Sequence, residues 1–179
     1  MSESAAREVL AAGKYVALVR ERGWEFLHRP GVSGIVILVA VTPAGGLLLV
    51  DQWRQPVGAR VIELPAGLAG DVPGQEHEPL ERAARRELVE ETGWDADSFE
   101  LLGRCVPSPG ATSEVVTYYA ARGLRRVGDG GGDEHEDIVV AEVPLGELDA
   151  WLQSQEAQGK LVDMKLWAGL ELARRQGAL

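Results

Sequence analysis

The chain has 179 residues, a formal net charge of −10, 45% hydrophobic residues and one cysteine. This length and composition predict one soluble globular domain with a small extension, and a single cysteine excludes an intrachain disulfide. The charge argues against a surface that follows a phosphate backbone, so we expect no nucleic-acid partner. Without a long apolar run or an apolar signal-peptide core, the sequence predicts no membrane association and a cytoplasmic location.

The first third of the chain alternates apolar runs with turn signals, which is typical of β-strands. Five strands are predicted, over residues 14–21, 24–29, 33–42, 45–53 and 60–67. We assign residues 1–32 to an N-terminal strand extension and residues 33–179 to the main domain.

One helix follows these strands. Apolar residues recur at helical spacing from Pro79 to Thr92, with Pro79 suited to a first turn and Gly93 to the end. Beyond it, the patterns predict strands over residues 100–106, 114–124 and 137–144, and helices over residues 145–158 and 162–176. Strands interrupted by one helix and closed by two more predict an α+β fold, in which a mixed β-sheet is sandwiched between α-helices.

The predicted helix carries three carboxylates, Glu87, Glu90 and Glu91, on one side. Like charges at this spacing destabilise a helix by a few tenths of a kcal/mol per pair, so a compensating cation is expected. Mg²⁺ prefers oxygen ligands and is commonly shared between one or two carboxylates, waters and substrate phosphates. The three side chains therefore predict a Mg²⁺ site, and an acidic solvated helix face is the alternative.

Residues 78–94, EPLERAARRELVEETGW, resemble the Nudix hydrolase box, G-x5-E-x7-R-E-U-x-E-E-x-G-U, where U is a bulky apolar residue. The fixed polar and glycine positions are occupied by Glu78, Arg86, Glu87, Glu90, Glu91 and Gly93. The leading glycine departs from the pattern, because Gly67 lies five residues too far from Glu78. We interpret residues 68–77 as a longer loop within a box that spans residues 67–94.

The resemblance implies a Nudix fold and metal-dependent hydrolysis of a nucleoside diphosphate linked to another group. It assigns the three carboxylates to the metal and to catalysis, with the backbone carbonyl of Ala66 completing a site for Mg²⁺ or, alternatively, Mn²⁺. Bound metal would neutralise phosphate oxygens and activate the attacking water. Arg86 and Glu78 are expected to hold the loop and the helix together.

Further stretches resemble the ADP-ribose pyrophosphatases of this family. In those enzymes a Trp stacks on adenine and Arg residues contact the substrate, which implies five substrate-binding positions: Trp24, Arg29, Arg54, Glu63 and Pro109. An Arg suits such a site because its planar fork binds phosphate oxygens bidentately. Ordinary surface or turn roles for the same residues stay open as alternatives.

A glycine-rich acidic stretch, residues 127–137, resembles mobile loops that bring a Glu to the attacking water in ADP-ribose and GDP-sugar hydrolases. The first candidate for this base is Glu136 and the second is Glu134, while a solvated linker is the alternative. The leading expectation is Mg²⁺-dependent hydrolysis of ADP-ribose to AMP and ribose 5-phosphate by a homodimer that exchanges N-terminal strands. The alternatives are hydrolysis of other nucleotide sugars such as GDP-mannose, and a non-catalytic sensor of such ligands.

Overall fold

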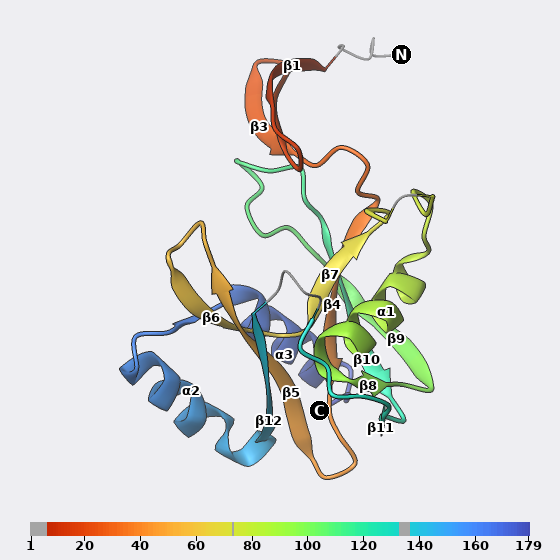
Figure 1. The fold of residues 1–179 in the computed structure, drawn as a ribbon, viewed down its shortest axis with the longest axis vertical. Coiled ribbons are helices and arrows are strands. Elements are labelled where there is room, and N and C mark those ends of the chain that lie inside the picture. The colour runs from red at the N-terminus through yellow and green to blue at the C-terminus, as the bar shows by residue number, and fades with distance from the viewer. Residues whose placement is uncertain (1–6, 73, 133–136) are drawn as a thin grey trace.

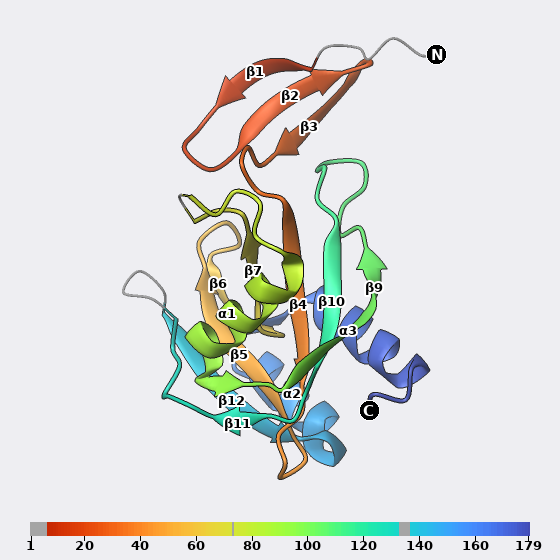
Figure 2. The ribbon, with the colours of Figure 1, turned by 90° about the vertical axis from the view of Figure 1, so that its right-hand side faces the viewer.

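The computed structural model describes residues 7–72, 74–132 and 137–179. A small antiparallel sheet at the N-terminal end stands beside a larger body of sheets and helices (Figures 1 and 2). Its strands, in the order β1-β2-β3, are β1 (Glu8–Ala12), β2 (Ala17–Glu21) and β3 (Trp24–His28). Within the described ranges, none of the helices has the length and apolar character needed to span a bilayer.

The central sheet of the body has the order β7-β4-β10-β9. Its strands are β7 (Ala66–Ala69), β4 (Gly34–Ala40), β10 (Val116–Arg122) and β9 (Ser98–Cys105). β4 runs parallel to β10, whereas the other neighbours are antiparallel. Helix α1 (Leu80–Thr92) covers one face and helix α3 (Met164–Arg175) covers the other (Figure 2). A mixed sheet between helices confirms the predicted α+β architecture.

The side chains of β4 divide the core into two layers. Val36 packs in one layer with Leu88 of α1, and Ile37 packs in the other with Leu166 of α3. All four side chains are at most 1% exposed. A strand that is buried on both faces reads as a continuous apolar run, which explains the sequence IVILVA at residues 35–40.

A second four-stranded sheet has the order β12-β5-β6-β13. Its strands are β12 (Ile138–Pro144), β5 (Gly46–Arg54), β6 (Ala59–Glu63) and β13 (Leu161–Val162). A 3₁₀ turn, η1 (Leu145–Glu147), leads from β12 into helix α2 (Leu148–Ala157). Two short strands, β8 (Trp94–Asp95) and β11 (Arg125–Arg126), pair next to the end of α1.

Several strands differ from the sequence prediction, and the short strands β8, β11 and β13 lie outside all of the predicted ones. The single strand expected over residues 60–67 is interrupted after Glu63, and the chain passes from β6 in one sheet to β7 in the other. Pro65 lies at the interruption, and its missing N–H prevents it from donating to a continuous ladder. β1 lies outside the predicted strands and pairs with β2.

Ion pairs around Asp51 join the second sheet to the segment before β12. Asp51 is 7% exposed. Its carboxylate accepts hydrogen bonds from Arg60 Nε and Lys160 Nζ, each at 2.7 Å. The same guanidinium of Arg60 donates through Nη1 to Asp137 Oδ2 at 2.7 Å. Arg60 therefore fixes the position at which the chain enters β12.

We expect Asp51→Asn to lower the free energy of unfolding by about 2–4 kcal/mol, because the substitution removes the charge that compensates two partly buried cations. Urea denaturation followed by circular dichroism would measure the loss. Glu100→Gln is a matched control, because it disrupts a pair with Arg122 whose side chains are 49% and 41% exposed. Equal losses in the two variants would contradict a structural role for Asp51.

Candidate active site

A cavity of about 650 Å³ opens beside β6, β7 and the start of α3. It gathers five of the residues predicted to form the site, namely Arg29, Arg54, Glu63, Ala66 and Glu87. They come from the segment after β3, the β5–β6 hairpin, β7 and α1. Segments that lie far apart in the sequence therefore meet at one cavity.

Helix α1 brings two carboxylates against β7. Glu91 is 4% exposed, and its Oε2 accepts a hydrogen bond from the backbone nitrogen of Ala66 at 2.9 Å. Glu87 lies one helical turn earlier on the same face and packs directly over Gly67. A Cβ atom at Gly67 would lie 1.9 Å from the carboxyl carbon of Glu87. The absence of a side chain at Gly67 therefore creates the place that the Glu87 carboxylate occupies.

Glu90 is the outermost of the three carboxylates. Its side chain is 53% exposed, whereas that of Glu87 is 12% exposed. Its Oε2 lies 3.2 Å from Arg86 Nη1. Within the described part of the chain, no three acidic, imidazole or thiol side chains converge closely enough to hold an ion together. Joint coordination by all three glutamates, and by the carbonyl oxygen of Ala66, stays a prediction.

The donor set fits a hard divalent cation. Mg²⁺ is usually held by one or two carboxylates, while waters and substrate phosphates complete its octahedral shell. Glu87 lines the cavity, which has room for such ligands, and Glu91 lies one helical turn further along the same face without lining the cavity itself. The cavity lining also has an acidic balance, with three cationic side chains (Arg29, Arg54, Lys165) and five acidic ones (Glu63, Asp71, Glu87, Glu114, Asp163).

Burial raises the pKa of Glu87 to about 7. The nearby Arg86 guanidinium, with its Nη1 2.7 Å from Glu87 Oε1, opposes this shift, whereas Glu90 and Asp71 reinforce it. A buried carboxyl group with a raised pKa gains from a nearby cation, which favours its charged form. The electrostatics of Glu87 therefore favour a cation at this position.

Arg86 holds α1 to the preceding loop, as the family resemblance implied. Its Nη2 donates to the backbone oxygen of Leu68 at 2.8 Å and to Glu78 Oε2 at 3.2 Å. The side chain of Glu78 is only 1% exposed. Burial by itself lowers the pKa of Arg86. The carboxylates of Glu78 and Glu87 have the larger combined effect and raise this pKa overall. The guanidinium therefore stays charged and fixes the helix face.

Arg54 and Glu63 form a two-point ion pair across the β5–β6 hairpin. One hydrogen bond joins Arg54 Nη2 to Glu63 Oε2 at 3.1 Å, and a second joins Nε to Oε1. Glu63 is 4% exposed and forms part of the cavity wall. Burial by itself lowers the pKa of Arg54, but the hydrogen bonds and the charge of the Glu63 carboxylate raise this pKa overall. A fixed, charged guanidinium thus faces the cavity.

Two further cavity residues, Asp163 and Lys165, lie outside the sequence predictions. Asp163 is the N-cap of α3, where its carboxylate accepts a hydrogen bond from the Lys165 backbone nitrogen at 2.8 Å and pairs with the Lys165 ammonium. The pairing of β13 with β6 brings both residues to the cavity, and the Asp163 backbone nitrogen donates to Ile62 at 3.0 Å. The only signal in the sequence was the N-cap pattern, because the position of both residues at the cavity depends on the pairing of β13 with β6.

Trp24 and Pro109 do not line this cavity. They line a separate hollow of about 370 Å³, and Trp24 is 63% exposed. The N-terminal sheet is held to the loop before β10 by a hydrogen bond from the Leu27 nitrogen to the Ala111 oxygen at 2.9 Å. Arg29, just after β3, lies at the cavity edge and donates through Nε to Glu114 Oε1 at 2.7 Å.

The glycine-rich stretch docks on the end of α1. The nitrogens of Gly131 and Gly132 donate to the carbonyl oxygens of Glu91 and Glu90 at 2.8 and 3.0 Å. Gly130 has a φ of 72°, and a Cβ there would lie 2.4 Å from the carbonyl carbon of Thr92. These contacts satisfy carbonyls that a helix end leaves unpaired, so the stretch up to Gly132 is no simple solvated linker. The predicted bases Glu134 and Glu136 lie outside the described residues.

The chain resembles known proteins in sequence. A family model described as the NUDIX domain matches residues 31–164. An ADP-ribose pyrophosphatase of Mycobacterium tuberculosis is 36% identical over 152 residues, which cover 81% of this chain and 72% of the relative. A GDP-mannose pyrophosphatase of Yersinia enterocolitica is 32% identical over 155 residues, covering 82% and 76%. A methanol dehydrogenase activator of Bacillus methanolicus is 29% identical over 156 residues, covering 87% and 78%.

The fold also has a counterpart among solved structures. The crystal structure of an ADP compounds hydrolase superposes with a TM-score of 0.72 over 96% of this chain and 91% of that chain. The sequence identity is 21%, so the likeness shows a shared fold.

The raised pKa of Glu87 predicts how stability depends on pH. Because the folded state binds this proton more tightly than the unfolded state, stability falls as the pH rises from about 4.5 to about 7. We expect Glu87→Gln in metal-free buffer to be more stable than the wild type by roughly 1–3 kcal/mol at pH 8, and nearly equal at pH 4. Urea denaturation at both values would measure the difference, with Glu81→Gln on the exposed first turn of α1 as control. A destabilised Glu87→Gln variant at pH 8 would contradict the shift.

Proposed function

Because the chain belongs to the Nudix family, we propose that it hydrolyses the diphosphate bond of ADP-ribose to give AMP and ribose 5-phosphate, with Mg²⁺ as cofactor. The observation that carries this proposal is the approach of Glu87 and Glu91 to β7, beside a cavity that also presents Arg54. The relative named ADP-ribose pyrophosphatase supports the choice of substrate.

The acidic face of α1 would hold the cofactor. Glu87 and Glu91, which pack against β7, are the first proposed ligands, and Glu90 and the Ala66 carbonyl are the further ones. When bound, a divalent cation supplies charge neutralisation at the diphosphate and lowers the pKa of the attacking water. The role of Arg86 is to position Glu87 and Glu90 through its hydrogen bonds to both.

The cationic side chains of the cavity would orient the diphosphate. Arg54 uses two of its donors on Glu63, and the rest of its guanidinium fork stays available for phosphate oxygens. Arg29, which is paired with Glu114 in the cavity lining, is proposed as a second substrate contact. Because each cation is held by a carboxylate, little side-chain entropy is lost when the substrate binds.

We propose Glu136 as the general base, with Glu134 as the alternative. Help of this kind typically contributes about 10²- to 10⁴-fold in rate. Support comes from the described residues on either side of this segment. The Gly132 nitrogen donates a hydrogen bond to the Glu90 carbonyl of α1, and Asp137 accepts one from Arg60.

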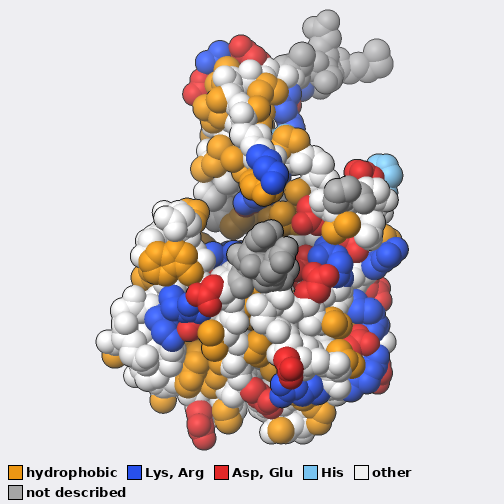
Figure 3. All heavy atoms as spheres, in the orientation of Figure 1, with side chains coloured by type: hydrophobic (Ala, Val, Ile, Leu, Met, Phe, Trp, Pro, Cys, Tyr) orange, Lys and Arg blue, Asp and Glu red, His pale blue; other side chains and the backbone are white. Residues whose placement is uncertain are grey.

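The ligand is proposed to be a small molecule, and the cytoplasm is the proposed compartment. On the face shown in Figure 3, basic side chains are interspersed with acidic ones, which supports a compact anionic ligand over a nucleic acid.

The partly buried Cys105 suits a reducing compartment. The relative named GDP-mannose pyrophosphatase favours a second candidate substrate, GDP-mannose, for the same site.

A homodimer would explain the position of Trp24. The indole is 63% exposed and lies in a different hollow from the metal face, and exposed apolar side chains Val9, Leu18 and Leu27 lie on the same sheet. We propose that a second copy covers this sheet, and that exchange of N-terminal sheets brings Trp24 to the adenine of the partner's substrate.

The proposed reaction is tested by incubating the purified protein with equal concentrations of ADP-ribose, GDP-mannose, UDP-glucose and NADH, with and without Mg²⁺. We expect AMP from ADP-ribose to form fastest and only with metal. Glu91→Gln should lower the rate roughly 10²-fold or more because it removes a proposed metal ligand. The thermal midpoint should stay near that of the wild type. Product formation without metal, or full activity of the variant, would contradict the proposal.

The proposed exchange of N-terminal sheets is tested by Trp24→Ala. We expect a dimer by sedimentation and a KM for ADP-ribose raised about tenfold, since stacking of a base on an aromatic ring is worth roughly 1–3 kcal/mol. Trp167→Ala is the matched control, because this indole is 48% exposed on α3 and does not line the cavity. A fully active monomer would refute the exchange.

A further inference from the structure

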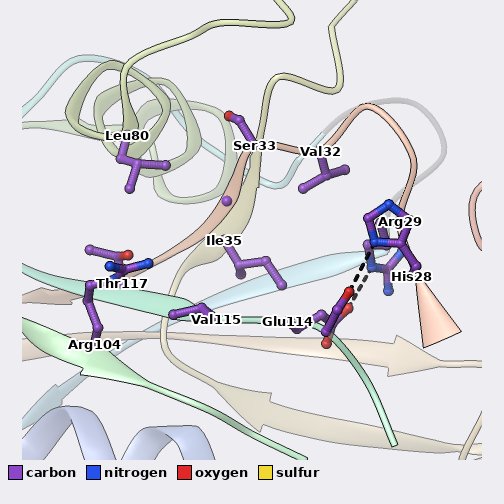
Figure 4. A pocket seen from close by; sticks show the side chains of 12 residues that line it. His28, Arg29, Val32, Ser33, Ile35, Leu80, Arg104, Glu114, Val115 and Thr117 are labelled. Atoms are coloured by element: carbon purple, nitrogen blue, oxygen red, sulfur yellow. Dashed lines mark hydrogen bonds and ion pairs between the residues drawn. The ribbon is translucent and has the colours of Figure 1, made fainter. Parts of the chain in front are cut away.

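A smaller hollow of about 200 Å³ lies on the α1 face of the central sheet, where the helix begins (Figure 4). Leu80, the first residue of α1, lies over one end together with Arg104 of β9 and Thr117 of β10. The pair formed by Arg29 and Glu114 lies at the other end. Glu87 and Glu91 of α1 do not line this hollow.

Arg104 and Thr117 form a matched pair of donors. They face each other directly in the antiparallel ladder of β9 and β10, so their side chains project from the same face of the sheet. Thr117 is 3% exposed, yet its hydroxyl makes no hydrogen bond to any residue that the structure describes. Arg104 likewise has no ion-pair partner in the described part of the chain. Among the described residues, Gln52 Oε1 is the only buried side-chain oxygen or nitrogen without a partner, so the Thr117 hydroxyl is reached by solvent from the hollow, where a ligand can replace that solvent.

The charges around the hollow favour an anion. Its lining carries two guanidinium groups, Arg29 and Arg104, and one carboxylate, Glu114, which Arg29 already holds at 2.7 Å. Burial lowers the pKa of His28, so this imidazole is neutral at neutral pH. The hollow therefore carries a positive balance in a chain whose net charge is −10, in contrast to the acidic lining of the larger cavity.

We propose that this hollow is a second anion site, in which a phosphate group binds between the guanidinium of Arg104 and the hydroxyl of Thr117. A guanidinium offers paired donors to phosphate oxygens, and a hydroxyl adds a third donor from the side. α1 begins at the same end without a side-chain cap, so its positive dipole end acts in the same direction. The phosphate group can belong to inorganic phosphate or to a phosphomonoester such as a sugar phosphate. The hollow shares Arg29, Ile35 and Glu114 with the lining of the larger cavity, whereas the proposed phosphate contacts Arg104 and Thr117 line the hollow alone, so the inference does not require the reaction proposed above.

Calorimetric titration of the metal-free protein with inorganic phosphate, at constant ionic strength, tests this site. We expect Arg104→Gln to weaken binding roughly tenfold and Thr117→Val about threefold, since each loses a donor to the anion. Arg174→Gln is the matched control, because it removes the same charge from an exposed side chain at the end of α3. The control should bind phosphate like the wild type.

Unchanged phosphate affinity in Arg104→Gln would overturn the site, because the anion would then bind elsewhere. An equal loss of affinity in Arg174→Gln would also overturn it, because binding would then follow the net charge of the protein. If Arg104→Gln fails to fold, Thr117→Val and the NMR shift of the Thr117 amide in wild-type protein decide in its place. Phosphate must move that amide in the wild type. A parallel titration with ribose 5-phosphate separates the two sources, because tighter, Arg104-dependent binding of the ester identifies a sugar phosphate, and equal binding identifies free phosphate.

Discussion

The close approach of α1 to β7 over Gly67 is the constraint on which the site depends. A carboxylate can pack this closely against a strand only where the strand has no side chain. Gly67 is such a position, and the Glu87 carboxylate packs directly against its backbone. The same approach lets Glu91 bind the Ala66 nitrogen. The two contacts hold both carboxylates against β7, and Glu87 also lines the cavity, so the helix face and the strand act as one unit.

The cavity combines charges of both signs in a regular way. Each cationic side chain in its lining is paired with a carboxylate: Arg29 with Glu114, Arg54 with Glu63, and Lys165 with Asp163. Paired charges are fixed in place and neutral overall, whereas Glu87 is buried without full compensation, which is why its pKa rises. A cation would thus find its strongest attraction at the α1 face, and phosphate oxygens would find fixed donors around it.

Local signals predicted much of this structure, and long-range pairing decided the rest. The apolar run of β4, the helical spacing of α1 and the turn at Gly93 gave elements close to those observed, and the spacing of the glutamates correctly placed them on one helix. The break at Pro65 separates two strands of different sheets, which a single apolar pattern does not distinguish. Asp163 and Lys165 reach the cavity only because β13 pairs with β6, a contact between residues about a hundred positions apart.

The short strand β13 has a consequence for local opening of the cavity. Only Leu161 and Val162 pair with β6, so this end of the sheet has few hydrogen bonds to lose. Opening of β13 would withdraw Asp163 and Lys165 together, while α1 stays packed in the layer on the opposite face of β4. The cavity wall is therefore built from two parts of unequal stability. Amide hydrogens around residues 161–163 should exchange with solvent well before those of α1.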